Sequence, residues 1–296
     1  MSGRIKCHKT KCHNDTTNKC QYNAVSNNTD ILSQLSQMQP ITLDQMSSIK
    51  LMNRIDTKFV TSRRLLLELL RRVQDKYYVQ EINGDRISPY RTTYFDTDKY
   101  EQYMQHHNRH SRRTKVRVRT YLSSGDLTFL EVKRKNNHLR TKKKRIQVKD
   151  LQTAAQTEGA SELVLKRTGL RLEDMHPIVQ NNFDRVTLVN YGKTERLTID
   201  FNVWFHNFET GNDFDTEKIV IIELKRDGNI FSPITNILRD LHIHQTGFSK
   251  CCIGMVTTDP NLKQNNFKQK LRMLRKINLD ETYQIRDSVE NIDDNT

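Results

Sequence analysis

The sequence KVRVRTYLSSGDLTFLEVK, residues 115–133, predicts two short strands joined by a turn. In the first strand Val116 and Val118 alternate with cationic residues, and in the second Leu130 and Val132 alternate with polar or aromatic ones. Because successive side chains of a strand point to opposite faces, each strand has one aliphatic and one ionic face. A hairpin with its cations in solvent would also fit, but the pattern recurs along the chain.

The alternation is clearest at residues 195–203, where Leu197 and Ile199 lie opposite Arg196, Thr198 and Asp200. In the cationic run 133–149, a nuclear-localisation or nucleic-acid patch is one interpretation. Strand alternation instead places Lys143 and Arg145 on an ionic face, opposite Ile146 and Val148. We predict further strands at 52–60, 92–96, 142–149, 182–189, 219–225 and 248–256, and helices at 31–38, 62–76, 151–168, 232–242 and 265–275.

Composition points to an anionic partner. The 296 residues carry a net charge of +14, and only 35% are hydrophobic, with a mean hydropathy of -0.78. Nucleic acid, a membrane surface and a polyanionic small molecule all fit such a charge. No apolar run approaches the roughly 20 residues of a membrane span, and the N-terminus lacks the apolar core of a signal peptide. We therefore expect a cytoplasmic protein without a membrane span of its own.

The two ends of the chain differ from its middle. Residues 1–30 are polar and predict a disordered tail, although Cys7, Cys12 and Cys20 with His8 and His13 leave a zinc site as an alternative. Residues 279–296 predict a flexible acidic tail. The predicted folded domain is residues 31–278.

We expect an α+β fold in which an antiparallel, eight-stranded sheet closes into a barrel, with a polar lumen and with helices packed on the aliphatic outside. Such a lumen would gather many like charges, which is costly unless a polyanion neutralises them. Arginine forms forked hydrogen bonds to phosphate oxygens, and lysine supplies a mobile charge. The implied ligand is a chain of phosphates. The converging cations are Lys58, Arg117, Arg119, Lys133, Lys143, Arg185, Arg196, Lys225 and Lys250.

Carboxylates recur two residues before a lysine, at Asp56, Glu131 and Glu223. A carboxylate beside phosphates is repelled unless a divalent cation bridges them. Glu223 is therefore the first candidate metal ligand. For Glu131 and Asp56, metal binding and a charge-balancing salt bridge are equally good interpretations.

Eight motifs, in order, resemble the vacuolar transporter chaperone (VTC) type polyphosphate polymerase domain of the triphosphate tunnel metalloenzyme (CYTH-like) superfamily. They cover about residues 41–276 and are RIDTKF at 54–59, YFDT at 94–97, KVRVRTY at 115–121, FLEVKRK at 129–135, NFDR at 182–185, RLTID at 196–200, IIELK at 221–225 and GFSK at 247–250. The resemblance implies an eight-stranded antiparallel tunnel. It also implies transfer of the γ-phosphate of ATP to a growing polyphosphate chain with Mn²⁺ or Mg²⁺.

Carried over by position, the resemblance assigns catalytic phosphate contacts to Lys58, Arg117, Arg119, Lys133, Arg185, Arg196 and Lys250. It makes Glu223 the metal ligand; Lys143, Arg145 and Lys225 are further substrate-binding candidates, and Glu131 a second candidate metal ligand. Two positions depart from the family pattern. Arg54 replaces the first acid of E-x-E-x-K, which favours a polymerase over a triphosphatase. Gly247 replaces a lysine of the eukaryotic domains, which leaves one fewer cation there.

The eukaryotic relatives carry membrane and lipid-sensing modules that this sequence lacks, so we expect a stand-alone, bacterial form, with a membrane-protein partner as a further option. A triphosphatase of the same fold is the alternative enzyme. A basic nucleic-acid-binding module is the alternative from another class, but it would need exposed aromatic platforms, and aromatic residues make up only 7% of the chain. We therefore expect ATP and polyphosphate, rather than nucleic acid, as ligands.

Overall fold

The computed structural model describes residues 28–47, 54–135, 141–216, 218–228 and 232–279. Most of both predicted tails, including the cysteine- and histidine-containing segment of the first, lies outside these residues. None of the described helices has an apolar run long enough to cross a membrane.

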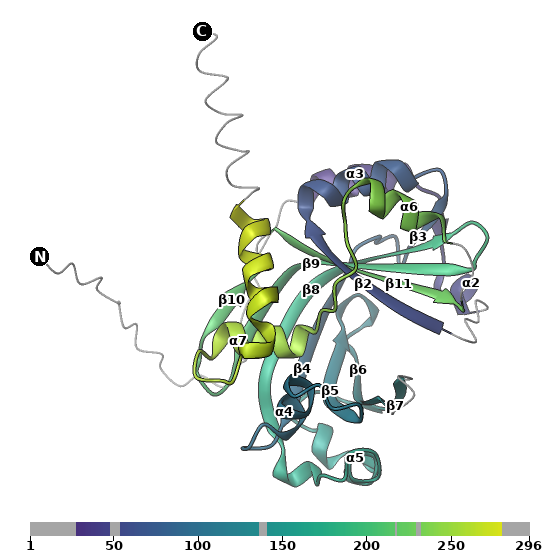
Figure 1. Ribbon diagram of the computed structural model, residues 1–296. Coiled ribbons are helices and arrows are strands. Elements are labelled where there is room, and N and C mark those ends of the chain that lie inside the picture. Colours follow the sequence, from purple (N-terminus) through teal and green to yellow (C-terminus); the bar gives the residue numbers. More distant parts are fainter. Residues whose placement is uncertain (1–27, 48–53, 136–140, 217, 229–231, 280–296) are drawn as a thin grey trace, which may run out of the picture.

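One large antiparallel sheet organises the molecule (Figure 1). Its main path runs β2–β11–β9–β8–β4–β5–β6–β7. The bounds are β2 Arg54–Ser62, β4 Ser88–Asp96, β5 Arg113–Tyr121, β6 Leu127–Lys135, β7 Thr141–Val148, β8 His176–Asn190, β9 Glu195–Asn207 and β11 Ile219–Asp227. Three short strands lie off this path: β1 Pro40–Ile41, β3 Tyr77–Gln80 and β10 Asp213–Asp215. The structure thus confirms an α+β protein with an antiparallel sheet.

The sheet is not shown closed. Its path ends at β2 and β7, and within the described residues no hydrogen-bonded ladder joins these two strands. On β7 the side chains from Thr141 to Arg145 are exposed, and four of these five residues are cationic. Exposed lysines at a sheet edge disfavour pairing with a further strand. The structure therefore does not show the predicted closure within the residues that it describes.

Helices cover the aliphatic face of the sheet, as the alternation predicts. Helices α1 (Thr29–Ser36), α3 (Arg63–Val73) and α6 (Pro233–Asp240) pack on one core, which includes Leu197, Ile199, Val220 and Ile222 from the strands. Helix α5 (Ala160–Thr168) packs on a second core with Val116, Val118, Leu130 and Val132. The side chain of Ser62 accepts a hydrogen bond from Leu65 N and so caps α3. The remaining described helices with defined bounds are α2 Leu43–Ser47, α4 Glu101–His107 and α7 Lys250–Thr258.

The prediction of a strand at 248–256 is wrong, because these residues form most of α7. Ser249 accepts a hydrogen bond from Cys252 N and caps the helix. The helix is buried on nearly every side, so its sequence shows no polar face, and a short apolar run of this kind can be a helix or a strand. Gly254 allows close packing, since a Cβ there would lie 2.4 Å from the Phe205 ring.

Helix α7 and the following helix, residues 268–279, cover an apolar end of the ionic side of the sheet (Figure 1). Their core contacts include Val60 and Ile221, which share strand faces with Lys58 and Glu223. The helix expected at 265–275 begins three residues later, after a 3₁₀ turn at Asn265–Phe267. Of the helix expected at 151–168, only α5 and a 3₁₀ turn at Ala154–Gln156 form. This side of the sheet therefore carries ionic side chains along part of its length, and α7 covers the apolar remainder.

Candidate functional site

Cross-strand registers bring the predicted ionic residues onto one face of the sheet. Arg117 lies opposite Glu131, Lys58 opposite Glu223, and Lys225 opposite Arg196. We call this set the ionic face. Its cations are Lys58, Arg117, Arg119, Lys133, Lys143, Arg145, Arg185, Arg196, Lys225 and, from α7, Lys250; its carboxylates are Asp56, Glu131, Asp200 and Glu223. Cations outnumber carboxylates, so the face carries a positive net charge.

Glu131 is fully buried between two cations. Arg117 Nε donates to its Oε2 at 2.8 Å, and Lys143 Nζ donates to its Oε1 at 2.8 Å. Burial alone would raise the pKa of Glu131, but the charges of Arg117, Arg119 and Lys143 lower it well below its usual range. Both carboxylate oxygens are thus engaged by cations, and the role of Glu131 as a second metal ligand stays a prediction.

Asp200 joins strand β8 to helix α7. Arg185 donates to its two oxygens at 2.5 and 2.7 Å, and Lys250 forms an ion pair with it. Burial would raise the pKa of Asp200, but Arg185 and Lys250 hold it well below its usual range. We did not predict Asp200 as a site residue. The signal was its phase with Arg196 on the ionic face of residues 195–203.

Glu223 is the most accessible of the three central carboxylates, with 22% of its side chain exposed. Lys225 lies 2.5 Å from Oε2, and Lys58 lies 3.8 Å from Oε1. Lys225 also donates to Thr198 Oγ1 at 2.8 Å, and Lys58 to the Phe248 carbonyl at 3.1 Å. Burial acts to raise the pKa of Glu223, but Lys225 and Lys58 lower it well below its usual range. The carboxylate therefore stays ionised.

A metal at Glu223 would need ligands from elsewhere. Among the described residues no group of three or more His, Cys, Asp or Glu side chains could hold an ion. Mg²⁺ is commonly bound by one or two carboxylates together with substrate phosphates. The donor set at Glu223 thus fits an ion that shares its coordination with a phosphate ligand.

Arg119 and Lys133 are cations without an acid of their own. Neither forms an ion pair with the described residues, although Arg119 Nε donates to Thr92 Oγ1 at 3.0 Å and its guanidinium lies 5.6 Å from the Tyr90 ring. Burial and the charges of Arg117 and Arg185 lower the pKa of Arg119. Arg117, followed by burial, lowers the pKa of Lys133 well below its usual value. Both side chains are held where a positive charge is unfavourable without an anion.

Arg145 and Arg196 complete the ionic face on strands β7 and β9. Arg145 is exposed on β7, with its guanidinium 4.2 Å from the Phe129 ring. Arg196 lies opposite Lys225 on β9. The structure therefore brings the predicted site residues to one face, with α7 rather than a strand supplying Lys250.

A family model described as "VTC domain" matches residues 53–258. Comparison with curated protein sequences gives no match. Among solved structures, a putative adenylate cyclase from Bacillus halodurans is 15% identical, over 67% of this chain and 96% of its own, with a TM-score of 0.46. A putative adenylyl cyclase from Hippeastrum with a dominant triphosphatase activity is 10% identical, over 70% and 97%, with a TM-score of 0.46. An inorganic triphosphatase is 13% identical, over 68% and 94%, with a TM-score of 0.27.

Proposed function

The chain belongs to the VTC domain family, and on that premise we propose that it is a polyphosphate polymerase, which transfers the γ-phosphate of ATP to a growing inorganic polyphosphate chain. The observation that carries the proposal is the surplus of cations over carboxylates on the ionic face. Arg119 and Lys133 form no ion pair with the described residues, and the charges of Glu131 and Glu223 only partly offset the lowering of their pKa values, so an anion rich in charge is the ligand that would stabilise them. A chain of phosphates supplies such charge at regular intervals.

The proposed reaction needs no side-chain nucleophile. An oxygen of the terminal phosphate of the acceptor chain attacks the γ-phosphorus, the bond from that phosphorus to the β–γ bridging oxygen breaks, and ADP leaves with the electron pair. Lys58, Arg117, Arg119, Lys133, Arg185, Arg196 and Lys250 would align the phosphates and neutralise their charge, with Lys143, Arg145 and Lys225 as further contacts. Alignment and charge stabilisation supply most of the catalysis in phosphoryl transfer.

Glu223 would hold a divalent ion, Mn²⁺ or Mg²⁺, whose charge would offset that of the phosphates. Glu131 would instead fix Arg117 and Lys143, and Asp200 would fix Arg185 and Lys250, because these acids are buried against those cations, whereas 22% of the Glu223 side chain is exposed. Closure of the sheet into a tunnel around the chain is part of the proposal. A cytoplasmic location and a membrane-protein partner stay predictions.

Incubation of the full chain with ATP and Mn²⁺, followed by gel electrophoresis of the products, tests the proposal. A polymerase gives long chains that an exopolyphosphatase degrades, together with ADP. Free phosphate without chains would assign the site to a triphosphatase, in which water replaces the acceptor. The absence of both polyphosphate chains and free phosphate would contradict both proposed enzyme activities.

Replacing Arg119 by leucine is expected to stabilise the ligand-free protein by about 1 kcal/mol, because an apolar group replaces a buried charge without an acidic partner. The same change should weaken tripolyphosphate binding about tenfold, by removal of a charge-assisted hydrogen bond. Urea unfolding and calorimetry measure the two effects. Loss of both stability and binding would make Arg119 a structural residue.

Lys250 should make binding depend on pH. Burial and Arg185 lower its pKa to about 8, although Asp200 opposes them. A bound phosphate favours the charged form, so above pH 8 binding must take up a proton and should weaken as pH rises. Below pH 8 Lys250 is already protonated, and this dependence should vanish.

The matched control is Lys250→Arg, since arginine keeps its charge over this range. Both proteins share the titration of tripolyphosphate itself, so the difference between their calorimetric pH profiles reports Lys250. The wild-type affinity should fall more steeply between pH 8 and 10 than that of the variant. If the affinities of the two proteins change with pH in the same way, Lys250 does not contact the bound tripolyphosphate.

A further inference from the structure

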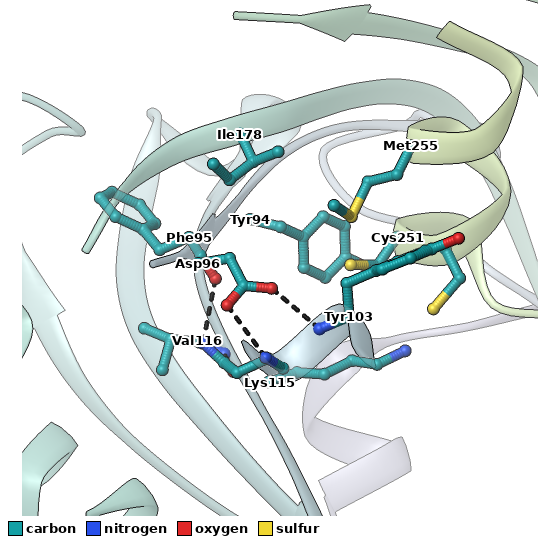
Figure 2. A pocket seen from close by; sticks show the side chains of 11 residues that line it. Tyr94, Phe95, Asp96, Tyr103, Lys115, Val116, Ile178, Cys251 and Met255 are labelled. Atoms are coloured by element: carbon teal, nitrogen blue, oxygen red, sulfur yellow. Dashed lines mark hydrogen bonds between the residues drawn. The ribbon is translucent and has the colours of Figure 1, made fainter. Parts of the chain in front are cut away.

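The row of cations continues beyond the ionic face. Lys115 precedes Arg117 by two residues on β5, so both side chains share one face, and Lys115 lies opposite Lys133. Its ammonium donates to Ser249 Oγ at 2.7 Å. Figure 2 shows the side chain pointing away from the Asp96 carboxylate, which accepts a hydrogen bond from Tyr103 N. Lys115 therefore brings a charge to the start of α7, where it shares a pocket with the Cys251 and Cys252 thiols. Burial acts to lower the pKa of Lys115, but these two thiols raise it.

Lys270 reaches the same place from the helix formed by residues 268–279, which packs with α7 in one core (Figure 1). Its Nζ lies 3.6 Å from the position that a Cβ at Gly247 would take. At that distance a Cβ would make an ordinary van der Waals contact, so the Lys270 ammonium lies directly beside residue 247. Within the part of the chain that the structure describes, Lys270 forms no hydrogen bond or ion pair, although it is partly buried. Burial lowers its pKa, and Arg109, Lys58 and Lys115 lower it further, partly opposed by Cys252.

The segment from Thr246 to Ser249 links these two lysines to the ionic face. Thr246 N donates to the Lys58 carbonyl at 2.7 Å, and Lys58 Nζ donates to the Phe248 carbonyl at 3.1 Å. Ser249 Oγ accepts the hydrogen bond from Lys115, and Gly247 lies beside Lys270. One short segment thus has Lys58 at the ionic face and two further lysines beside it. Gathering these like charges is costly unless an anion lies among them.

We propose that Lys115 and Lys270 form an outer phosphate subsite, which binds the part of a polyphosphate chain that extends beyond the ionic face. Lys115 lies roughly 7 Å further along β5 than Arg117, at a rise of about 3.4 Å per residue. A short ligand held by Arg117 and its neighbours would not need this subsite, whereas a longer chain would reach it. The inference rests on the proposed function, because it takes polyphosphate as the ligand.

The test compares tripolyphosphate with long-chain polyphosphate by calorimetry. Lys270→Ala removes the outer charge, and the matched control, Lys268→Ala, removes an exposed lysine from the same helix. Relative to the control, Lys270→Ala should weaken long-chain binding about tenfold, which corresponds to about 1.4 kcal/mol, and tripolyphosphate binding less than about twofold. Lys270→Gln, which keeps most of the side-chain length, should give the same result if the alanine variant unfolds.

The outcomes separate the subsite from the function. Suppose that the wild-type protein binds long-chain polyphosphate tightly and that Lys270→Ala and Lys268→Ala bind it equally well. This result overturns the outer subsite and leaves the proposed function intact. Equal weakening of both ligands also overturns it, because Lys270 would then act on the ionic face itself. A wild-type protein that binds neither ligand contradicts the proposed function and, with it, the subsite.

Discussion

Replacing Asp200 by asparagine is expected to destabilise the ligand-free protein by about 3–5 kcal/mol, the cost of leaving buried charges without their partner. Asp200 is the acid that Arg185 and Lys250 share, and the exposed fractions of those two side chains are only 15% and 12%. An amide of the same shape keeps the volume but loses the charge. Urea unfolding should show the loss as a lower midpoint with an unchanged slope.

Glu68 provides the matched control, because it also bridges two cations, Arg71 and Arg72, but on the outside of α3. Surface ion pairs contribute little, so Glu68→Gln should leave the midpoint almost unchanged. Tripolyphosphate should restore much of the stability of Asp200→Asn, since its charge can replace the missing carboxylate. Equal midpoints for the two variants would mean that Asp200 does not stabilise the cluster as the structure indicates.

Replacing Glu223 by glutamine is expected to lower metal-dependent turnover at least about 100-fold, comparable to the loss of a major electrostatic contact in a transition state. A neutral amide is a poor ligand for a hard cation. Polyphosphate synthesis would be measured over a Mn²⁺ titration, with circular dichroism to verify the fold.

Glu131→Gln is the matched control for Glu223→Gln, because it makes the same substitution at a fully buried glutamate of the ionic face. That variant should lose stability, since Arg117 and Lys143 lose their shared partner, yet keep the wild-type Mn²⁺ dependence. If Glu223→Gln keeps the wild-type titration, Glu223 serves only its salt bridge with Lys225. If Glu131→Gln shifts the titration instead, the metal lies at Glu131.

Strand alternation was sufficient to predict most of the ionic face. The period of two in residues 115–133 placed Arg117 and Glu131 on one side and Val116 and Leu130 on the other, and the structure has this arrangement. Lys143 was selected from three consecutive lysines by phase alone, and its Nζ lies 2.8 Å from Glu131. Such local patterns are reliable because backbone geometry fixes them.

Features that depend on distant parts of the chain were not predictable. The run at 248–256 is buried all round, so its sequence could not reveal that α7 is a helix. The role of Asp200 depends on Lys250, which lies 50 residues away in the sequence. Lys270 lies in the helix predicted at 265–275, but only the packing of that helix on α7 brings the side chain near Gly247. Closure of a sheet likewise depends on how its two edges meet.

The central claim is that the ionic face binds a chain of phosphates, and comparison of melting temperatures with different polyanions tests it most directly. A ligand that binds only the native state stabilises it by about 2.7 kcal/mol at ~100 times its dissociation constant. Tripolyphosphate should therefore raise the melting temperature by several degrees, whereas monophosphate and single-stranded DNA at equal phosphate concentration should change it little. If DNA matches tripolyphosphate, the face is a general polyanion surface and the account is wrong.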